Sequence, residues 1–109
     1  MKTFGSEFTR LRKLRGLTQK AVADTLGVDT AYMSRVATDE SYSPTEDRIA
    51  KIAAVLKLNE EERDGLFFAA GKIPPEVIKA MRRNPKLFTV VRWADRRHKY
   101  EAREARTRR

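Results

Sequence analysis

The chain has 109 residues, a formal net charge of +9 and no cysteine. This length suits one domain, alone or with an appendage, and the lack of cysteine excludes disulfides and cysteine-ligated zinc. Because the N-terminal MKTFGSEF has no long apolar run and no later stretch approaches the roughly 20 apolar residues that span a bilayer, we expect a soluble, cytoplasmic protein that binds no membrane.

The first predicted helix covers residues near 4 to 15. Its apolar side chains recur at helical spacing, so one face should be buried and the other, with Arg10 and Lys13, exposed. The apolar residues are Phe4, Phe8, Leu11 and Leu14. Gly16 is expected to end this helix.

Two short helices joined by a tight turn are predicted over residues 19–38. Their inner faces carry Val22, Ala23 and Leu26 on the first helix and Met33 and Val36 on the second. Ala23 should lie where the helices come closest, Gly27 suits a left-handed turn, and Val28 should plug the turn into the core. An ordinary amphipathic pair needs no small residue, glycine and apolar plug at these offsets. The segment therefore predicts a helix-turn-helix that reads DNA.

Residues that can accept a hydrogen bond from the first amides of a helix stand where helix caps are expected. They are Thr18 for the second helix, Asp29 or Thr30 for the third, Thr45 after Pro44 for the fourth, and Asn59 with Glu62 as a capping box for the fifth. These positions set the expected beginnings of four helices.

The rest of the chain also shows helical spacing and no strand-like alternation. The expected buried residues are Ile49, Ile52, Ala53 and Leu56 in the fourth helix and Leu66, Phe67 and Ala70 in the fifth, which should end at Gly71. After a short break, Pro75 can begin a short helix, and Asn84 with Pro85 can supply the cap and first turn of a long one. We expect an all-α protein with a five-helix domain at residues 1–71 and a C-terminal helical extension at residues 72–109.

The charge is unevenly distributed along the chain. Residues 1–20 hold six basic and one acidic residue, residues 21–70 hold five and ten, and residues 71–109 hold thirteen and four. A polyanion partner is one interpretation, because each phosphate contact by Lys or Arg releases condensed counterions. The other interpretation is a set of solvated faces that keep the protein soluble.

From about Phe4 to about Leu58 the chain resembles the lambda-repressor-like, or Cro/Xre, helix-turn-helix regulators. The similar segments are RLRKLRGLTQKAVADTLGV, YMSRV in the third helix and SPTEDRIAKIAAVLKL. The resemblance implies a five-helix lambda-repressor-like DNA-binding domain with one or two additional C-terminal helices, in a bacterial, phage or plasmid context. The chain departs from the pattern at Ala37 and Asp39, where many members have a glutamate and a glycine. In relatives that glutamate pairs with an arginine of the first helix, so the resemblance leaves Arg12 without this partner.

By the same resemblance, the third helix enters the major groove and its exposed residues read the bases. The predicted base-reading residues are Thr30, Ala31, Ser34 and Arg35. Arg35 can bond a guanine O6 and N7 together, and Ala31 can contact a thymine methyl group. The alternative for Arg35 is a surface salt bridge with Asp39 or Asp29.

A second set of residues is predicted to contact the DNA backbone or to cap helices. It comprises Thr18, Gln19, Lys20, Tyr32, Ser41 and Tyr42. The amides of Gln19 and Lys20 would present the positive end of the second helix to a phosphate. Tyr32 has two open interpretations, a DNA contact or a cover over the helix junction.

The C-terminal extension is predicted to form a homodimer, because the family commonly binds two-fold symmetric operators and one short helix makes few base contacts. The predicted interface residues are Val77, Ile78, Met81, Leu87, Phe88, Val90, Val91, Trp93 and Ala94. Core packing within one chain is the alternative. The terminal EAREARTRR is expected to add nonspecific attraction to phosphates.

The predicted function is sequence-specific binding of double-stranded DNA by a dimeric transcriptional regulator, with repression favoured. The alternative is an antitoxin or protein-interaction module whose C-terminal helices bind a partner protein, and a nonspecific RNA or DNA binder is a third hypothesis. We expect no enzyme, no metal and no cofactor, because His98 stands among arginines without cysteine or paired carboxylates at a useful spacing.

Overall fold

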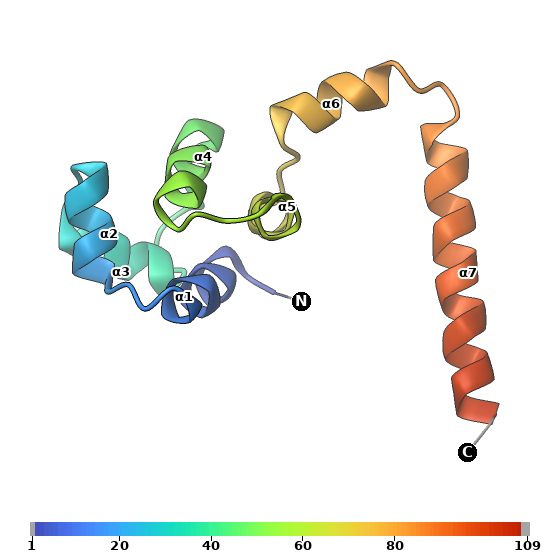
Figure 1. Cartoon of the computed structure of the whole chain (residues 1–109), viewed down its shortest axis with the longest axis horizontal. Helices are drawn as coiled ribbons and strands as arrows, with labels where there is room; N and C mark the ends of the chain where they lie inside the picture. The colour runs from blue at the N-terminus through green and yellow to red at the C-terminus, as the bar shows by residue number, and fades with distance from the viewer. Residues whose placement is uncertain (1, 108–109) are drawn as a thin grey trace. The chain divides into compact units, whose positions relative to one another are not determined.

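Residues 2–107, which the computed structural model describes, form seven helices and no strand (Figure 1). In chain order the helices are α1 (Phe4–Leu14), α2 (Gln19–Leu26), α3 (Thr30–Ala37), α4 (Glu46–Val55), α5 (Glu60–Ala69), α6 (Pro75–Arg82) and α7 (Leu87–Thr107). The prediction of an all-α protein with additional C-terminal helices is confirmed. The chain divides into two compact units, Met1–Pro74 and Pro75–Arg109.

The first unit is built around one hydrophobic core to which all five of its helices contribute. Its buried side chains are Phe4, Phe8, Leu11, Val22, Ala23, Met33, Val36, Ile49, Ile52, Leu56, Leu66 and Phe67. These are the apolar faces that the three-and-four spacing predicted for each helix. The core therefore fixes α2 and α3 against α1 and α4.

One apolar residue of the first helix was assigned to the wrong face. Leu14 is 63% exposed, whereas Phe8 and Leu11 have no exposed surface. At 100° per residue Leu14 lies about 90° from the centre of the stripe formed by Phe4, Phe8 and Leu11, so it points away from the core. The prediction that Leu14 belongs to the buried face is wrong.

The predicted caps are present at the beginnings of four helices. The side chains of Thr18, Asp29 and Thr45 accept hydrogen bonds from the first turns of α2, α3 and α4. At α5 Asn59 and Glu62 form a reciprocal capping box. Since a cap and the amide it accepts from lie two or three residues apart, the sequence alone could locate them.

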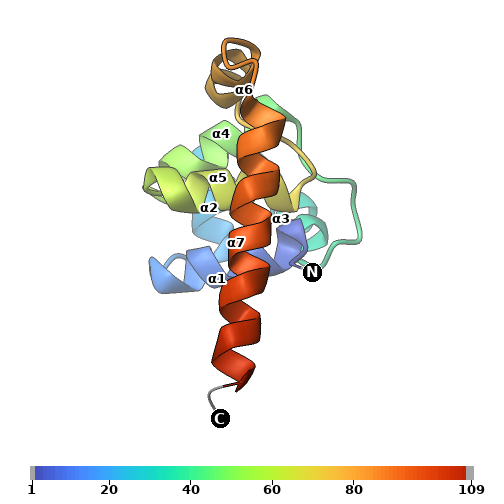
Figure 2. The same ribbon diagram turned by 90° about the vertical axis from the view of Figure 1, so that its right-hand side faces the viewer.

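The cap expected at the last helix is wrong. The Asn84 side-chain amide donates to the carbonyl oxygen of Ala80 (2.6 Å), at the end of α6, and the backbone oxygen of Asn84 accepts from the Leu87 amide (3.0 Å). Asn84 thus closes the short helix, and its side chain does not begin the long one. α7 then runs as one continuous helix (Figure 2).

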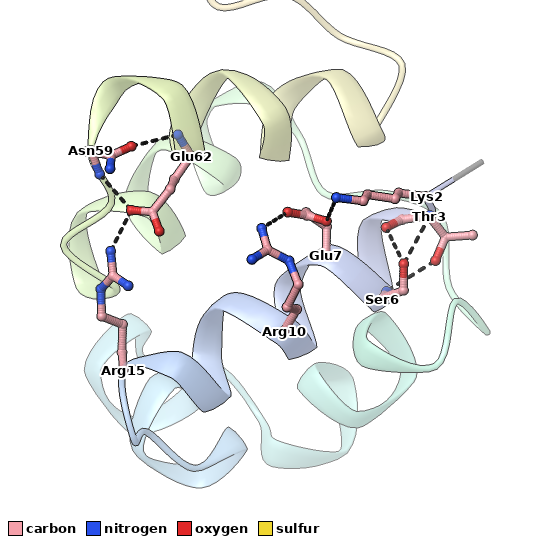
Figure 3. A network of polar contacts seen from close by, with 8 residues as sticks. All are labelled: Lys2, Thr3, Ser6, Glu7, Arg10, Arg15, Asn59 and Glu62. Atoms are coloured by element: carbon pink, nitrogen blue, oxygen red, sulfur yellow. Dashed lines mark hydrogen bonds and ion pairs between the residues drawn. The ribbon is translucent and has the colours of Figure 1, made fainter. Parts of the chain in front are cut away.

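Ion pairs lie along α1, and one of them joins the end of α1 to α5 (Figure 3). Glu7 is only 5% exposed and pairs with Arg10 and with Lys2, and the hydrogen bond from Arg10 is the main cause that lowers the pKa of Glu7. Arg15 pairs with Glu62, the capping-box residue of α5. The pKa of Glu62 is lowered first by its hydrogen bond from the Asn59 backbone and then by Arg15.

Among the described helices, none combines the length and the apolar composition that a bilayer crossing requires.

Candidate nucleic-acid interface

The turn between α2 and α3 has the geometry of a close helix pair. Gly27 adopts φ +71°, and the Val28 amide donates to the Ala23 carbonyl oxygen (3.0 Å), which closes the end of α2. Ala23 is fully buried, and Val28 packs against the core. Because this turn is short and α2 and α3 are both fastened to the core, α3 has a fixed orientation with one face turned outward.

The four predicted base-reading residues all lie on α3 and are all exposed. They are Thr30, Ala31, Ser34 and Arg35. Within residues 2–107 the Arg35 guanidinium makes no ion pair or hydrogen bond. Both acids that could have paired with it are engaged elsewhere, since Asp29 caps α3 and Asp39 bonds Thr3 and Gly5. The salt-bridge alternative for Arg35 is therefore absent from this structure.

The beginning of α2 leaves backbone donors exposed beside the helix cap. Thr18 accepts a hydrogen bond from the Ala21 amide (3.0 Å), and the first backbone bond of the helix runs from Val22 to Thr18. The amides of Gln19 and Lys20 precede that bond and have no acceptor within the helix. The Lys20 ammonium group pairs with Asp24 at 3.0 Å in an exposed i,i+4 pair, which leaves it mobile enough to exchange partners.

The loop after α3 lies next to Arg35. A surface hollow is lined by Arg35, Asp39, Glu40, Ser41 and Tyr42. Tyr42 is 96% exposed, so its hydroxyl is available to a ligand, and Ser41 is half-buried. The structure thus brings Arg35, Ser41 and Tyr42 together, whereas Glu40 adds an exposed negative charge to the same hollow.

Tyr32 occupies a different environment from the other predicted contacts. Its ring is half-buried against the core, and the Arg48 guanidinium lies over it at 5.3 Å from the ring centroid. The ring therefore packs between α3 and Arg48 of α4, and only its exposed edge can contact a ligand. Arg48 was not singled out from the sequence, because nothing local relates residues 32 and 48.

Arg12 also gains a partner that sequence reasoning missed. Its guanidinium donates to the Leu17 carbonyl oxygen (2.7 Å), and so fastens the end of α1 to the loop that begins α2. Its Nε is buried without a hydrogen-bond partner in the described chain. The Leu17 carbonyl oxygen thus takes part of the place of the acidic partner that Ala37 cannot supply to Arg12.

The predicted dimer residues divide between half-buried and exposed positions in the second unit. Ile78, Met81, Leu87 and Phe88 line one hollow. Phe88, Val90, Val91 and Trp93 are between 56% and 69% exposed, Ala94 is exposed, and neither α6 nor α7 contains a buried residue. Such a set of large exposed apolar side chains is typical of an interaction surface.

Comparison with known proteins gives two matches. The sequence model of a family described as a helix-turn-helix domain matches residues 3–66. Over 97 residues the chain is 31% identical to RghRB, an uncharacterized HTH-type transcriptional regulator of Bacillus subtilis (strain 168), and the match covers 86% of this chain and 68% of that protein. No solved structure matches the chain.

Proposed function

The chain belongs to the helix-turn-helix domain family, and we propose that it is a sequence-specific, double-stranded-DNA-binding transcriptional regulator of the lambda-repressor-like (Cro/Xre) type. The observation that carries this proposal is the exposed face of α3, on which the Arg35 side chain has no partner among residues 2–107. An arginine that no neighbouring carboxylate engages pays no cost of breaking an ion pair when it reaches a base. In this proposal α3 lies in the major groove.

We assign base reading to Thr30, Ala31, Ser34 and Arg35. Arg35 carries the largest share, because a bidentate arginine contact to guanine discriminates by about 1–3 kcal/mol. The exposed Ala31 methyl group suits a thymine methyl, and the two hydroxyl residues donate or accept at either base type. These roles give α3 a preferred sequence with guanine opposite Arg35.

Backbone contacts would position this helix without adding specificity. The free amides of Gln19 and Lys20, at the positive end of α2, suit one phosphate oxygen. Tyr42, with its ring almost wholly exposed, suits another from the loop after α3. Thr18 both caps α2 and can reach the first phosphate with its hydroxyl group, since the two roles use different atoms or lone pairs.

We further propose that two copies bind a two-fold symmetric operator and repress transcription by occupying it. The exposed apolar side chains Phe88, Val90, Val91 and Trp93 of α7 support the homodimer. The full chain with Val91→Asp should then be monomeric by analytical ultracentrifugation, with Thr89→Asp, an exposed and polar neighbour on α7, as the matched control. A wild-type chain that sediments as a monomer would instead favour a different protein as the partner of this surface.

The decisive experiment is selection of bound fragments from genomic DNA, followed by affinity measurements with the recovered duplex and a shuffled one. Arg35→Ala should reduce the preference for the recovered duplex about tenfold or more, because one bidentate contact is lost. Lys51→Ala, which removes an exposed cation paired with Asp47 on α4, should leave the preference unchanged. An Arg35→Ala chain that keeps the full preference would show that α3 has been assigned the wrong role.

A further inference from the structure

Asp39, directly after the last turn of α3, has a backbone conformation that usually belongs to glycine. Its φ is +60°, its amide donates to the Val36 carbonyl oxygen (3.2 Å), and the Glu40 amide donates to that of Arg35 (2.9 Å). This pair of bonds is the Schellman motif, in which the left-handed position strongly favours glycine. The same motif closes α1, α2 and α5 with Gly16, Gly27 and Gly71, and α4 with Lys57.

The Asp39 side chain explains why an L-residue occupies this position. One carboxylate oxygen accepts the Gly5 amide (2.9 Å), and the other accepts the Thr3 hydroxyl (2.7 Å). Thr3 is the N-cap of α1 and Gly5 lies in its first turn, so the carboxylate neutralises unpaired donors at the positive end of that helix. These bonds join segments 34 and 36 residues apart in the sequence.

Gly5 allows the end of α3 to approach α1 this closely. A Cβ atom at residue 5 would lie 2.6 Å from the Ala37 carbonyl oxygen and 2.8 Å from both Asp39 carboxylate oxygens. The Ala37 carbonyl oxygen, in the last turn of α3, thus lies against the backbone of Gly5 in the first turn of α1. The contact is backbone against backbone, with Asp39 bonded across it.

We propose that Asp39 is a positioning residue for DNA reading, which holds the C-terminal end of α3 against the beginning of α1 and thereby sets the orientation of Ser34 and Arg35. This inference rests on the proposed function of α3. A bidentate contact requires the arginine to be held within about 0.5 Å and 10–20° of its productive geometry. Arg35 lies one turn before Asp39, and its own carbonyl oxygen accepts one of the Schellman bonds, so movement of Asp39 is transmitted to it directly.

The test measures the ratio of affinities of the full-length protein for the genomically selected duplex and for a shuffled duplex. Asp39→Gly keeps the left-handed backbone and removes the carboxylate, and we expect the ratio to fall about tenfold, the equivalent of one charge-assisted hydrogen bond. Asp39→Asn retains an acceptor oxygen without the charge, so it should give an intermediate ratio. Thr3→Val removes one of the two bonds from the side of α1, together with the cap on the Ser6 amide, and should give a smaller fall.

Two matched controls separate positioning from charge and from backbone conformation. Glu40→Gln removes the neighbouring exposed charge and should raise both affinities together, leaving the ratio unchanged. Lys57→Gly relieves the other left-handed non-glycine residue, whose side chain has no partner in the described chain, and should raise the melting temperature. Asp39→Gly should fail to raise it, because the relief is offset by the lost bonds.

The double variant Thr3→Val/Asp39→Gly decides whether the effect passes through α1. Its ratio should equal that of Asp39→Gly alone when both are measured well below their melting temperatures, where the lost cap on Ser6 lowers stability and not the ratio, whereas additive losses would overturn the inference. An unchanged ratio in Asp39→Gly, measured well below its melting temperature, would overturn the inference and leave the proposed function standing. A wild-type chain that binds both duplexes equally would refute the proposed function and, with it, this inference. If Asp39→Gly does not fold, the ratios of Asp39→Asn and Thr3→Val decide, and unchanged values in both overturn the inference.

Discussion

Replacing Ala23 by leucine tests whether the helix-turn-helix depends on close packing of α2 on α3. Ala23 has no exposed surface, and its carbonyl oxygen accepts the bond from Val28 that closes the turn. Leucine adds three carbon atoms at a position that is fully buried in the core. Because the core is close-packed and Ala23 has no exposed surface, the larger side chain cannot turn toward solvent, so α2 must move or neighbouring side chains must leave their preferred rotamers.

The expected cost follows from the overpacking of comparable cores, about 1–3 kcal/mol. For a domain of 60–100 residues each kcal/mol lowers the melting temperature by about 4–8 °C, so Ala23→Leu should lower it by roughly 5–20 °C. Thermal unfolding followed by circular dichroism measures this shift, and urea unfolding gives the free energy independently. Affinity for the selected duplex should fall as well, because α3 is displaced.

The matched control is Ala54→Leu, an exposed alanine on α4. Leucine and alanine both favour helix, so this variant should stay within about 0.5 kcal/mol of wild type. If Ala23→Leu were as stable as Ala54→Leu, the interpretation of Ala23 as the point of closest approach would be refuted.

Two further predictions concern charged residues. The pKa of Glu7 is lowered in the folded state, so near the ordinary carboxyl pKa of 4.5 the unfolded chain binds more protons than the folded chain; the stabilisation by Glu7 is therefore present above that value and is lost as the pH falls through the lowered pKa. Glu7→Gln should have a lower free energy of unfolding than wild type near neutral pH, and acidification should lower that free energy less in the variant. Equal pH profiles of melting temperature for the two proteins would contradict this. Arg96 and Arg103 lie on one face of α7 and make no ion pair within the described chain. If both side chains contact phosphates, replacing both with glutamine should reduce the slope of log affinity against log salt concentration, measured with a nonspecific duplex, by about 1.8. Lys51→Gln serves as the control there, and an unchanged slope in the double variant would show that this face of α7 does not contact DNA.

Local relations explain why much of the fold was predictable. Thr18, Asp29 and Asn59 accept hydrogen bonds from amides two or three residues further on, and Gly27 closes the helix directly before it. Such features are set by the backbone geometry of a single turn, whatever the rest of the chain does. The periodicity of apolar residues is equally local, and it gave the buried face of each core helix. The prediction for Leu14 was wrong because this residue, at the end of α1, lies about 90° around the helix from the buried stripe.

The candidate site was predictable to the extent that exposure follows from helical periodicity. The positions of Thr30, Ala31, Ser34 and Arg35 opposite the buried Met33 and Val36 follow from the same wheel. Whether Arg35 was free could not be known, since Asp29 and Asp39 were equally available to it by sequence. The tertiary fold decided this by giving both acids other partners.

The sequence by itself thus determined the helices, the caps of α2 to α5 and, apart from Leu14, the buried faces of the core helices, because these depend on residues within one or two turns. Only the tertiary structure decided which distant groups meet. It placed Asp39 on Gly5 and Thr3, Arg48 over Tyr32, and Arg12 on a carbonyl of the next loop. These contacts depend on how helices cross, and a crossing geometry is fixed by the whole core at once rather than by any segment of it.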